Sequence, residues 1–382
     1  MKKAFIFACV CFFVVFSLSF YKENDIKTAK TNLNFAVTTQ KALELSFDEI
    51  LIKNSEKSAH SSSLLRFKEG ILLVFFAGTK EGAKDVRIYK SFLNAGKFDE
   101  PKAILSAKDL SLMSKKFIKK LGNPVLFKDT NERVHLFVVG VSLGGWATSK
   151  IYQLRFDESL EKLEFIGELK LSNLANFSHL VRTPALALQN SGFVLPFYHE
   201  LADKYALLGY FDDKARLKFT QRLNSLKSQL QPSMIATNSN SCLIFFRNHK
   251  AYENDAFMQS CENPEQIIKT NLKSYDTSSV LFSFDFEGKK RILLVHNDAG
   301  KKMPRKSLSL YYLTNLENLT NEAHFTKLFT IKEADEVSYP SVSLDEKNAY
   351  LSFTLDRKNI LFKRFSLESL NSLIEKLEQG VR

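Results

Sequence analysis

The chain has 382 residues, and its apolar side chains fall in short runs of Phe, Leu, Ile and Val bounded by Gly, Asn, Asp and Lys. This pattern is typical of short strands and excludes a fold of long helices. The net charge of +12 favours an anionic partner such as a glycan. No aromatic-basic module accompanies the charge, so we expect no nucleic-acid binding.

The first segment, residues 1–20, is predicted to be a signal peptide or an N-terminal membrane anchor. Lys2 and Lys3 precede an uncharged apolar run from Ala4 to Phe20. A cationic start followed by such a run is typical of export signals, and about 17 apolar residues is also the lower limit for a membrane span. Both interpretations place the protein outside the cytoplasm, whether periplasmic, anchored in the inner membrane or secreted. Residues 21–42 are predicted to be a linker.

Residues 43–382 contain one phrase six times: an apolar strand, a short polar or Gly-containing turn, and a second, strongly apolar strand. Internal repetition with this spacing predicts one all-β domain, a six-bladed β-propeller. The strand-like residues 43–52 are expected to supply the outer strand of the last blade and so close the ring. The six copies occupy residues 63–78, 123–140, 183–200, 231–248, 278–298 and 339–356.

Two further elements are predicted outside the repeats. The densest basic cluster, Lys115, Lys116, Lys119 and Lys120, is interpreted as the solvated face of a short helix before Gly122. Residues 366–379 place their leucines on one helical stripe, which predicts a short C-terminal helix packed against the propeller.

Cys242 and Cys261 flank a predicted hairpin. If the hairpin is symmetric, the two residues lie opposite each other on neighbouring strands, at a separation that a disulfide can bridge. Export would permit the bond. Two buried free thiols are the alternative, and the sequence leaves both open.

Four copies of the phrase begin at a residue followed by proline. In a propeller the inner strands run along a central channel, so equivalent positions at their ends form a ring around one mouth. The alternative is that each proline only fixes an extended entry into its strand, which we favour for Asn123 and Thr183. The four dipeptides are Asn123-Pro124, Thr183-Pro184, Gln231-Pro232 and Tyr339-Pro340.

The chain resembles the sialidase superfamily, in its BNR repeat-like branch. The resemblance rests on an ordered set of short stretches that spans about residues 45 to 365, and it implies a six-bladed propeller. These stretches lie at residues 58–64, 78–88, 122–126, 144–146, 195–200, 231–233 and 338–341.

The resemblance implies roles for particular residues. Tyr339 stands where that family has its nucleophile, and Arg247 and Arg305 stand where two arginines bind the substrate carboxylate. Glu81 is the candidate acid/base, with Asp85 as the alternative.

Two positions depart from the family pattern. His60 stands where the first arginine is expected, while the similar motif at Arg182 belongs to the third repeat. Gln231 stands where the glutamate that partners the tyrosine is expected, and a neutral amide cannot accept the phenolic proton. Glu200 or Glu336 is a possible substitute for that carboxylate.

The sole tryptophan, Trp146, either offers a flat face to a sugar ring or is buried between blades. The leading hypothesis is therefore a sialidase-like glycoside hydrolase that acts on an acidic sugar such as sialic acid. A non-catalytic carbohydrate-binding propeller and a uronate-directed lyase are the alternatives. We expect no cofactor, no metal, a monomer, and membrane contact only through the N-terminal segment.

Overall fold

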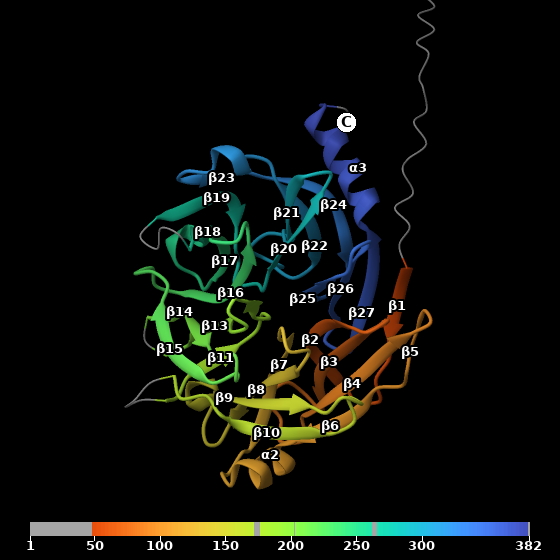
Figure 1. Ribbon diagram of the computed structural model, residues 1–382, viewed down its shortest axis with the longest axis vertical. Helices are drawn as coiled ribbons and strands as arrows, with labels where there is room; N and C mark the ends of the chain where they lie inside the picture. Colours follow the sequence, from red (N-terminus) through yellow and green to blue (C-terminus); the bar gives the residue numbers. More distant parts are fainter. Residues whose placement is uncertain (1–47, 172–175, 202, 262–265, 381–382) are drawn as a thin grey trace, which may run out of the picture. The chain divides into compact units, whose positions relative to one another are not determined.

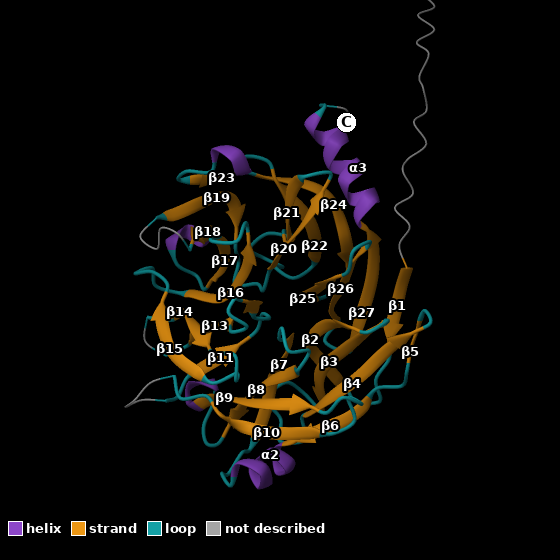
Figure 2. Ribbon diagram, in the orientation of Figure 1, coloured by secondary structure: helices purple, strands orange, loops and turns teal. Residues whose placement is uncertain are grey.

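The computed structural model describes residues 48–171, 176–201, 203–261 and 266–380. Their strands form six sheets of four or five strands, set side by side around one centre (Figure 1). The predicted six-bladed β-propeller is therefore confirmed, and the few helices lie at its rim (Figure 2). The expected export segment and linker, residues 1–42, lie outside the described residues.

In the first three blades, the repeated phrase forms the innermost strands and the hairpin between them. The first blade comprises β2 (Ser58–Phe67), β3 (Gly70–Gly78), β4 (Arg87–Asn94), β5 (Lys97–Phe98) and β6 (Lys102–Ser106). The second comprises β7 (Lys120–Lys128), β8 (Val134–Val141), β9 (Ser149–Phe156) and β10 (Leu163–Glu168). The third comprises β11 (His179–Val181), β12 (Leu186–Ala187), β13 (Phe193–His199), β14 (Tyr205–Phe211) and β15 (Leu217–Arg222).

The remaining blades repeat this order. The fourth comprises β16 (Gln229–Ala236), β17 (Cys242–Asn248), β18 (Asp255–Ser260), β19 (Ile267–Lys273) and β23 (Glu322–Ala323). The fifth comprises β20 (Val280–Phe286), β21 (Lys289–Asn297), β22 (Ser307–Leu313) and β24 (Phe325–Glu333). The sixth comprises β25 (Val337–Leu344), β26 (Asn348–Leu355), β27 (Asn359–Ser366) and β1 (Asp48–Ile52). Short 3-10 turns are η1 (Trp146–Thr148), η2 (Tyr252–Asn254) and η3 (Leu316–Asn318).

The ring closes through β1. This strand pairs antiparallel with β27, so the start of the described chain completes the blade formed by its end. Closure covers the outer edge of β27, which would otherwise offer unpaired N–H and C=O groups for association. The prediction that residues 43–52 supply this strand is confirmed for Asp48–Ile52.

The core consists of six hydrophobic clusters, and each is built mainly from two neighbouring blades. Leu72 of the first blade packs in one cluster with Leu136 of the second, and Ile71 packs in another with Phe362 of the sixth. The inner strands are apolar on both faces because each sheet is covered on both sides by its neighbours. This two-sided burial explains why they read as continuous apolar runs.

Four inner strands carry a β-bulge at the same end. The register shifts in β2, β7, β16 and β25, and in each case a residue with positive φ begins the bulge. The φ angles are 55° at Ser61, 25° at Asn123, 45° at Gln231 and 56° at Tyr339. The interpretation that Pro124 only fixes an extended entry into the strand is therefore wrong for Asn123, because this residue has a positive φ. A left-handed non-glycine residue costs about 1–3 kcal/mol and is typical of functional sites.

The helices differ from their predictions in one respect. Helix α2 (Ala107–Ser114) ends because Lys115 adopts a left-handed C-cap, so the lysine cluster follows this helix and is not its solvated face. Helix α3 (Leu367–Glu378) is confirmed, and it buries Leu370 and Ile374 against the fifth and sixth blades.

The hairpin of β17 and β18 has the symmetric register. Leu243 pairs with Ser260, which sets Cys242 opposite Cys261. The two cysteines form a disulfide with a Cα–Cα distance of 5.1 Å. No helix in the described part of the chain is both long and apolar enough to cross a bilayer.

Candidate functional site

A cavity of about 210 Å³ opens at the end of the propeller where the four bulges lie. Its residues come from strand ends and turns of all six blades, so the repeat brings together side chains far apart in the sequence. Most of them are polar or charged. They are Glu81, Asn123, Trp146, Leu180, Tyr198, Glu200, Gln231, Arg247, Arg305, Tyr339 and Arg357.

Tyr339 lines this cavity, and the residue is only 8% exposed. The bulge in β25 turns it toward the centre. The Arg247 Nη1 donates to its hydroxyl oxygen at 3.4 Å, and the Arg305 guanidinium lies 5.4 Å from the ring centroid. The phenol is thus surrounded by positive charge, which stabilises any negative charge that develops on its oxygen.

Three arginines line the cavity, and each is oriented by a carboxylate. Arg247 Nε donates to Asp276 at 2.8 Å, and Arg305 Nη1 donates to Glu336 at 3.1 Å. Burial alone would lower the pKa of Arg247, but Tyr339 and Asp276 raise it above its usual value. Guanidinium groups held in this way keep donors that can receive a ligand carboxylate in bidentate fashion.

The third guanidinium, Arg357, links the sixth blade to the first. Its Nε donates to Glu336 at 2.7 Å, and its Nη1 donates to Glu81 at 3.0 Å. Burial alone would raise the pKa of Glu336, but its bonds to Arg357 and Ser338 lower it, so this carboxylate stays ionised. Glu336 therefore serves as the shared anchor of two arginines.

Glu200 is in a different electrostatic state. Its carboxyl lines the cavity at the end of the third blade, and no described side chain donates a hydrogen bond to it. Burial raises its pKa, and the opposing charge of Arg247 offsets only part of the shift. A carboxyl with a raised pKa can exchange a proton nearer to neutral pH than an ordinary glutamate.

Gln231 faces the cavity from the bulge in β16. Its Nε2 donates to the Tyr198 hydroxyl at 3.3 Å, and Asn123 Nδ2 donates to the same oxygen at 3.3 Å. Burial raises the pKa of Tyr198 well above its ordinary value, so this phenol is neutral. The Gln231 Oε1 is buried and has no hydrogen-bond partner among the described residues.

Arg182 and His60 lie behind Tyr339 and are absent from the cavity lining. Arg182, 2% exposed, donates to the carbonyls of Ser62 and Pro340 at 3.3 and 2.8 Å and so ties the third blade to the first and sixth. Burial lowers its pKa to about 10. The His60 ring lies 4.3 Å from that of Tyr339, and burial, followed by the charges of nearby arginines, holds its pKa well below the usual range.

Asp85 also lies outside the cavity lining. Its carboxylate accepts bonds from the backbone and hydroxyl of Thr79, and this shapes the loop that carries Glu81. Trp146 lines the cavity edge and packs directly on Gly122, where an added Cβ would lie 2.6 Å from the indole. No three His, Cys, Asp or Glu side chains cluster as a metal site in the residues that the structure describes.

The sequence reasoning missed four lining residues: Asn123, Leu180, Tyr198 and Arg357. A signal for Arg357 exists: Arg247, Arg305 and Arg357 each stand at or after the end of the second strand of their blade, in three consecutive blades. Tyr198 carries no comparable signal, because it reads as one more apolar residue of β13.

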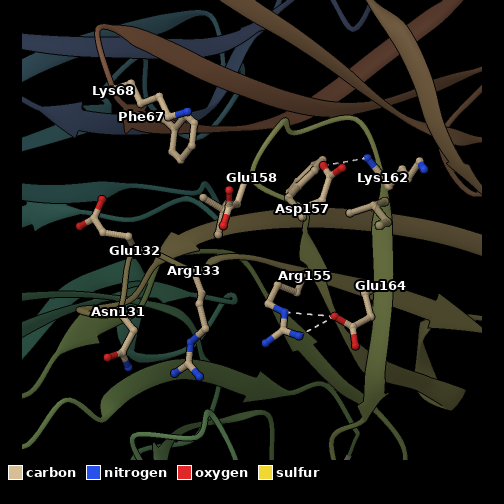
Figure 3. Close-up of a pocket in the computed structure, with 13 residues that line it drawn as sticks. Phe67, Lys68, Asn131, Glu132, Arg133, Arg155, Asp157, Glu158, Lys162 and Glu164 are labelled. Carbon is tan, nitrogen blue, oxygen red and sulfur yellow. Dashed lines mark hydrogen bonds and ion pairs between the residues drawn. The ribbon is translucent and has the colours of Figure 1, made fainter.

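A larger cavity of about 720 Å³ lies at the opposite ends of the strands, between turns of the first and second blades (Figure 3). Charges of both signs line it, and Arg133 and Glu132 pair with Asp129 and Lys128 outside the lining. Arg155 pairs with Glu164 at 2.5 Å, and Asp157 accepts from the backbone of Lys162 at 3.0 Å. Its lining mixes opposite charges, whereas three guanidinium groups converge in the smaller cavity, so the smaller cavity is the better candidate for an anionic ligand.

Comparison with known proteins agrees with this architecture. A profile of the BNR repeat-like domain matches residues 69–351. The chain belongs to the BNR repeat-like family. The predicted BNR repeat-like branch is thereby confirmed. No curated protein matched the sequence of this BNR repeat-like protein.

Solved structures share the fold at low sequence identity. A protein of unknown function from Dyadobacter fermentans has a TM-score of 0.64 and 14% identity, over 84% of this chain and 98% of that chain. The K499G mutant of NanB sialidase from Streptococcus pneumoniae has a TM-score of 0.65 and 9% identity, over 84% of this chain and 71% of that chain. Trypanosoma rangeli sialidase in complex with sialic acid has a TM-score of 0.60 and 10% identity, over 87% of this chain and 59% of that chain. This BNR repeat-like chain thus spans about 59% of the length of that sialidase chain.

Proposed function

We propose that this protein is a glycoside hydrolase that binds an acidic sugar in the central cavity and releases it from a glycan. The observation that carries the proposal is the meeting of Arg247, Arg305 and Arg357 around Tyr339 in one cavity. Three oriented guanidinium groups suit a carboxylate-bearing ring better than a neutral one. A T. rangeli sialidase of the same fold was solved with sialic acid, which supports this ligand class.

The proposed reaction uses Tyr339 as nucleophile. Its oxygen bonds to the anomeric carbon while the glycosidic C–O bond breaks, and the leaving oxygen takes a proton from Glu81. The phenolic proton passes to Glu200, which with Glu81 supplies the two carboxyl groups among the described lining residues. Water then attacks the tyrosyl–sugar bond, Glu81 accepts the water proton, and Tyr339 regains its proton from Glu200.

A second candidate function is binding without turnover, and Gln231 favours it. The amide occupies a position where a base is needed, and it donates to Tyr198. No described carboxylate hydrogen-bonds to the Tyr339 hydroxyl, which accepts from Arg247. A propeller with this arrangement holds an acidic sugar and leaves the glycosidic bond intact.

The choice between hydrolysis and binding without turnover is tested by measuring product release from a panel of sialosides, uronosides and natural acidic glycans. We expect wild type to release an acidic sugar and Tyr339→Phe to bind the same glycan without release. Tyr210→Phe is the matched control, because its hydroxyl bonds to Gln221 on the third blade, outside the cavity. Saturable binding with no product from wild type would reject hydrolysis on that panel, and an unsaturated sugar product would indicate a lyase.

The pH profile tests Glu200 separately. Because burial raises its pKa, we expect one limb of the wild-type profile of kcat/KM to lie above the ordinary glutamate range. Glu200→Gln should remove this limb and slow turnover by roughly 10²–10⁴-fold. An unchanged profile in an active Glu200→Gln variant would leave the hydrolase standing and assign the proton transfer to another group.

We also propose that the protein is exported. The disulfide between Cys242 and Cys261 supports this, since such bonds persist mainly in oxidising compartments. Fractionation of the native host followed by thiol labelling tests the proposal, and a reduced cytoplasmic protein would contradict it.

A further inference from the structure

Three large apolar side chains stand in solvent at the end of α2 and just after it. Leu112 is 69% exposed, Phe117 is 64% exposed and Met113 is 38% exposed. Only 11 large hydrophobic side chains are this exposed among the described residues, and three of them fall within these six positions. Exposed apolar residues that occur singly need no explanation, but a group of this kind marks an interaction site.

The exposure is fixed by the surrounding structure. Helix α2 buries Ala107 and Leu110 and begins with a capping box between Ser106 and Asp109. Beyond its C-cap the chain is held again, because the Ile118 N–H donates to the Ser111 hydroxyl at 2.9 Å. Leu112, Met113 and Phe117 therefore point outward from an anchored segment at the rim of the propeller, where Figure 1 shows α2 outside the second blade.

Five lysines lie in the same stretch of the chain, between residues 108 and 120. Lys108, Lys115 and Lys116 are exposed, and Lys119 and Lys120 are half-buried. The same segment holds one carboxylate, Asp109, which is engaged in the helix cap. Lys116 also pairs with Glu168 at 2.6 Å. We call these five lysines, together with Leu112, Met113 and Phe117, the apolar-basic patch.

We propose that the apolar-basic patch docks on an anionic lipid surface, with Leu112, Met113 and Phe117 inserted at the level of the headgroups. Lysines flanking exposed Leu and Phe side chains are the composition of interfacial membrane helices. A second copy of the chain is a poor occupant, because it would bring five further lysines against the first five. The proposal is independent of catalysis and of the N-terminal segment.

Local insertion is measured with a tryptophan probe, so that membrane contact elsewhere in the full chain does not interfere. Phe117→Trp is mixed with phosphatidylglycerol vesicles whose acyl chains are brominated, and the signal of Trp146 is subtracted with the wild-type protein. We expect quenching of the added fluorescence. Phe219→Trp is the matched control, since Phe219 is 57% exposed on β15 of another blade, and it should not be quenched.

The charge requirement is measured by cosedimentation. Each lysine near an anionic surface contributes a factor of about five in partitioning, so Lys108→Gln/Lys115→Gln should weaken binding to phosphatidylglycerol by roughly 30-fold. Lys301→Gln/Lys302→Gln, a pair of exposed lysines in another loop, should leave it unchanged. Phosphatidylcholine vesicles should bind weakly.

Two results would overturn the proposal. One is an unquenched Phe117→Trp in a folded protein, and the other is equal binding by both lysine pairs. Self-association that Phe117→Ser abolishes, without vesicle quenching, would assign the patch to a second copy instead.

Discussion

The disulfide between Cys242 and Cys261 should stabilise the propeller mainly by restricting the unfolded chain. The bond joins residues 19 positions apart. Loop-closure arithmetic for this separation gives about 3 kcal/mol at 25 °C. For a domain of this size, that loss lowers Tm by roughly 4 °C.

The assay compares oxidised wild type, reduced wild type and Cys242→Ala/Cys261→Ala by thermal and denaturant unfolding. Reductant should lower the free energy of unfolding of wild type and leave the double variant unaffected, which controls for Cys9 and Cys11, the two cysteines of the predicted export segment. Ligand affinity should not change, because the ladder that pairs Leu243 with Ser260 still positions β17 and its Arg247. An unchanged stability after verified reduction would refute the reasoning.

Three further outcomes are expected. Gln231→Glu adds a carboxylate beside Tyr198, where the resemblance places the base, and should raise turnover of an acidic aryl glycoside by roughly 10²-fold over the rate that Glu200 supports; equal rates would contradict this expectation. Gly122→Ala forces a Cβ against the Trp146 indole, which should cost about 1–3 kcal/mol and change the emission of this single tryptophan. Arg182→Met removes the donors to two buried carbonyls and should cost about 2 kcal/mol or more in denaturant unfolding. Weaker ligand binding by Arg182→Met at unchanged stability would contradict its supporting position.

The blade count was predictable from the sequence because each blade repeats the same two-strand phrase. Neighbouring blades bury both faces of the inner strands, so apolar runs recur at nearly regular intervals. The closing strand was predictable for the same reason, since Asp48–Ile52 reads as a strand without a phrase of its own. The lysine cluster was misassigned because its periodicity does not reveal that Lys115 turns left-handed and ends α2.

The site was only partly predictable. X-Pro dipeptides located Gln231 and Tyr339 at one mouth, but Asn123 was interpreted as a simple strand entry. The left-handed bulges that turn all three residues inward were not predicted. The sequence also did not show which arginines reach the cavity and which are buried below it. Arg182 matches a substrate-binding motif, yet it bonds to backbone carbonyls beneath Tyr339, while Arg357 in an unremarked turn reaches the cavity.

Residues at three of the four bulges contribute to the chemistry of the cavity, whereas the hydrophobic clusters between blades stabilise the fold. At Asn123, Gln231 and Tyr339 the left-handed backbone of the bulge turns the residue toward the cavity. Each position is supplied by a different blade, and Asn123 and Gln231 are coupled because both donate to the Tyr198 hydroxyl. Exchanging the residue types at these three positions is a direct way to obtain propellers of the same architecture with altered ligand preference. Every variant would keep the same six hydrophobic clusters between blades.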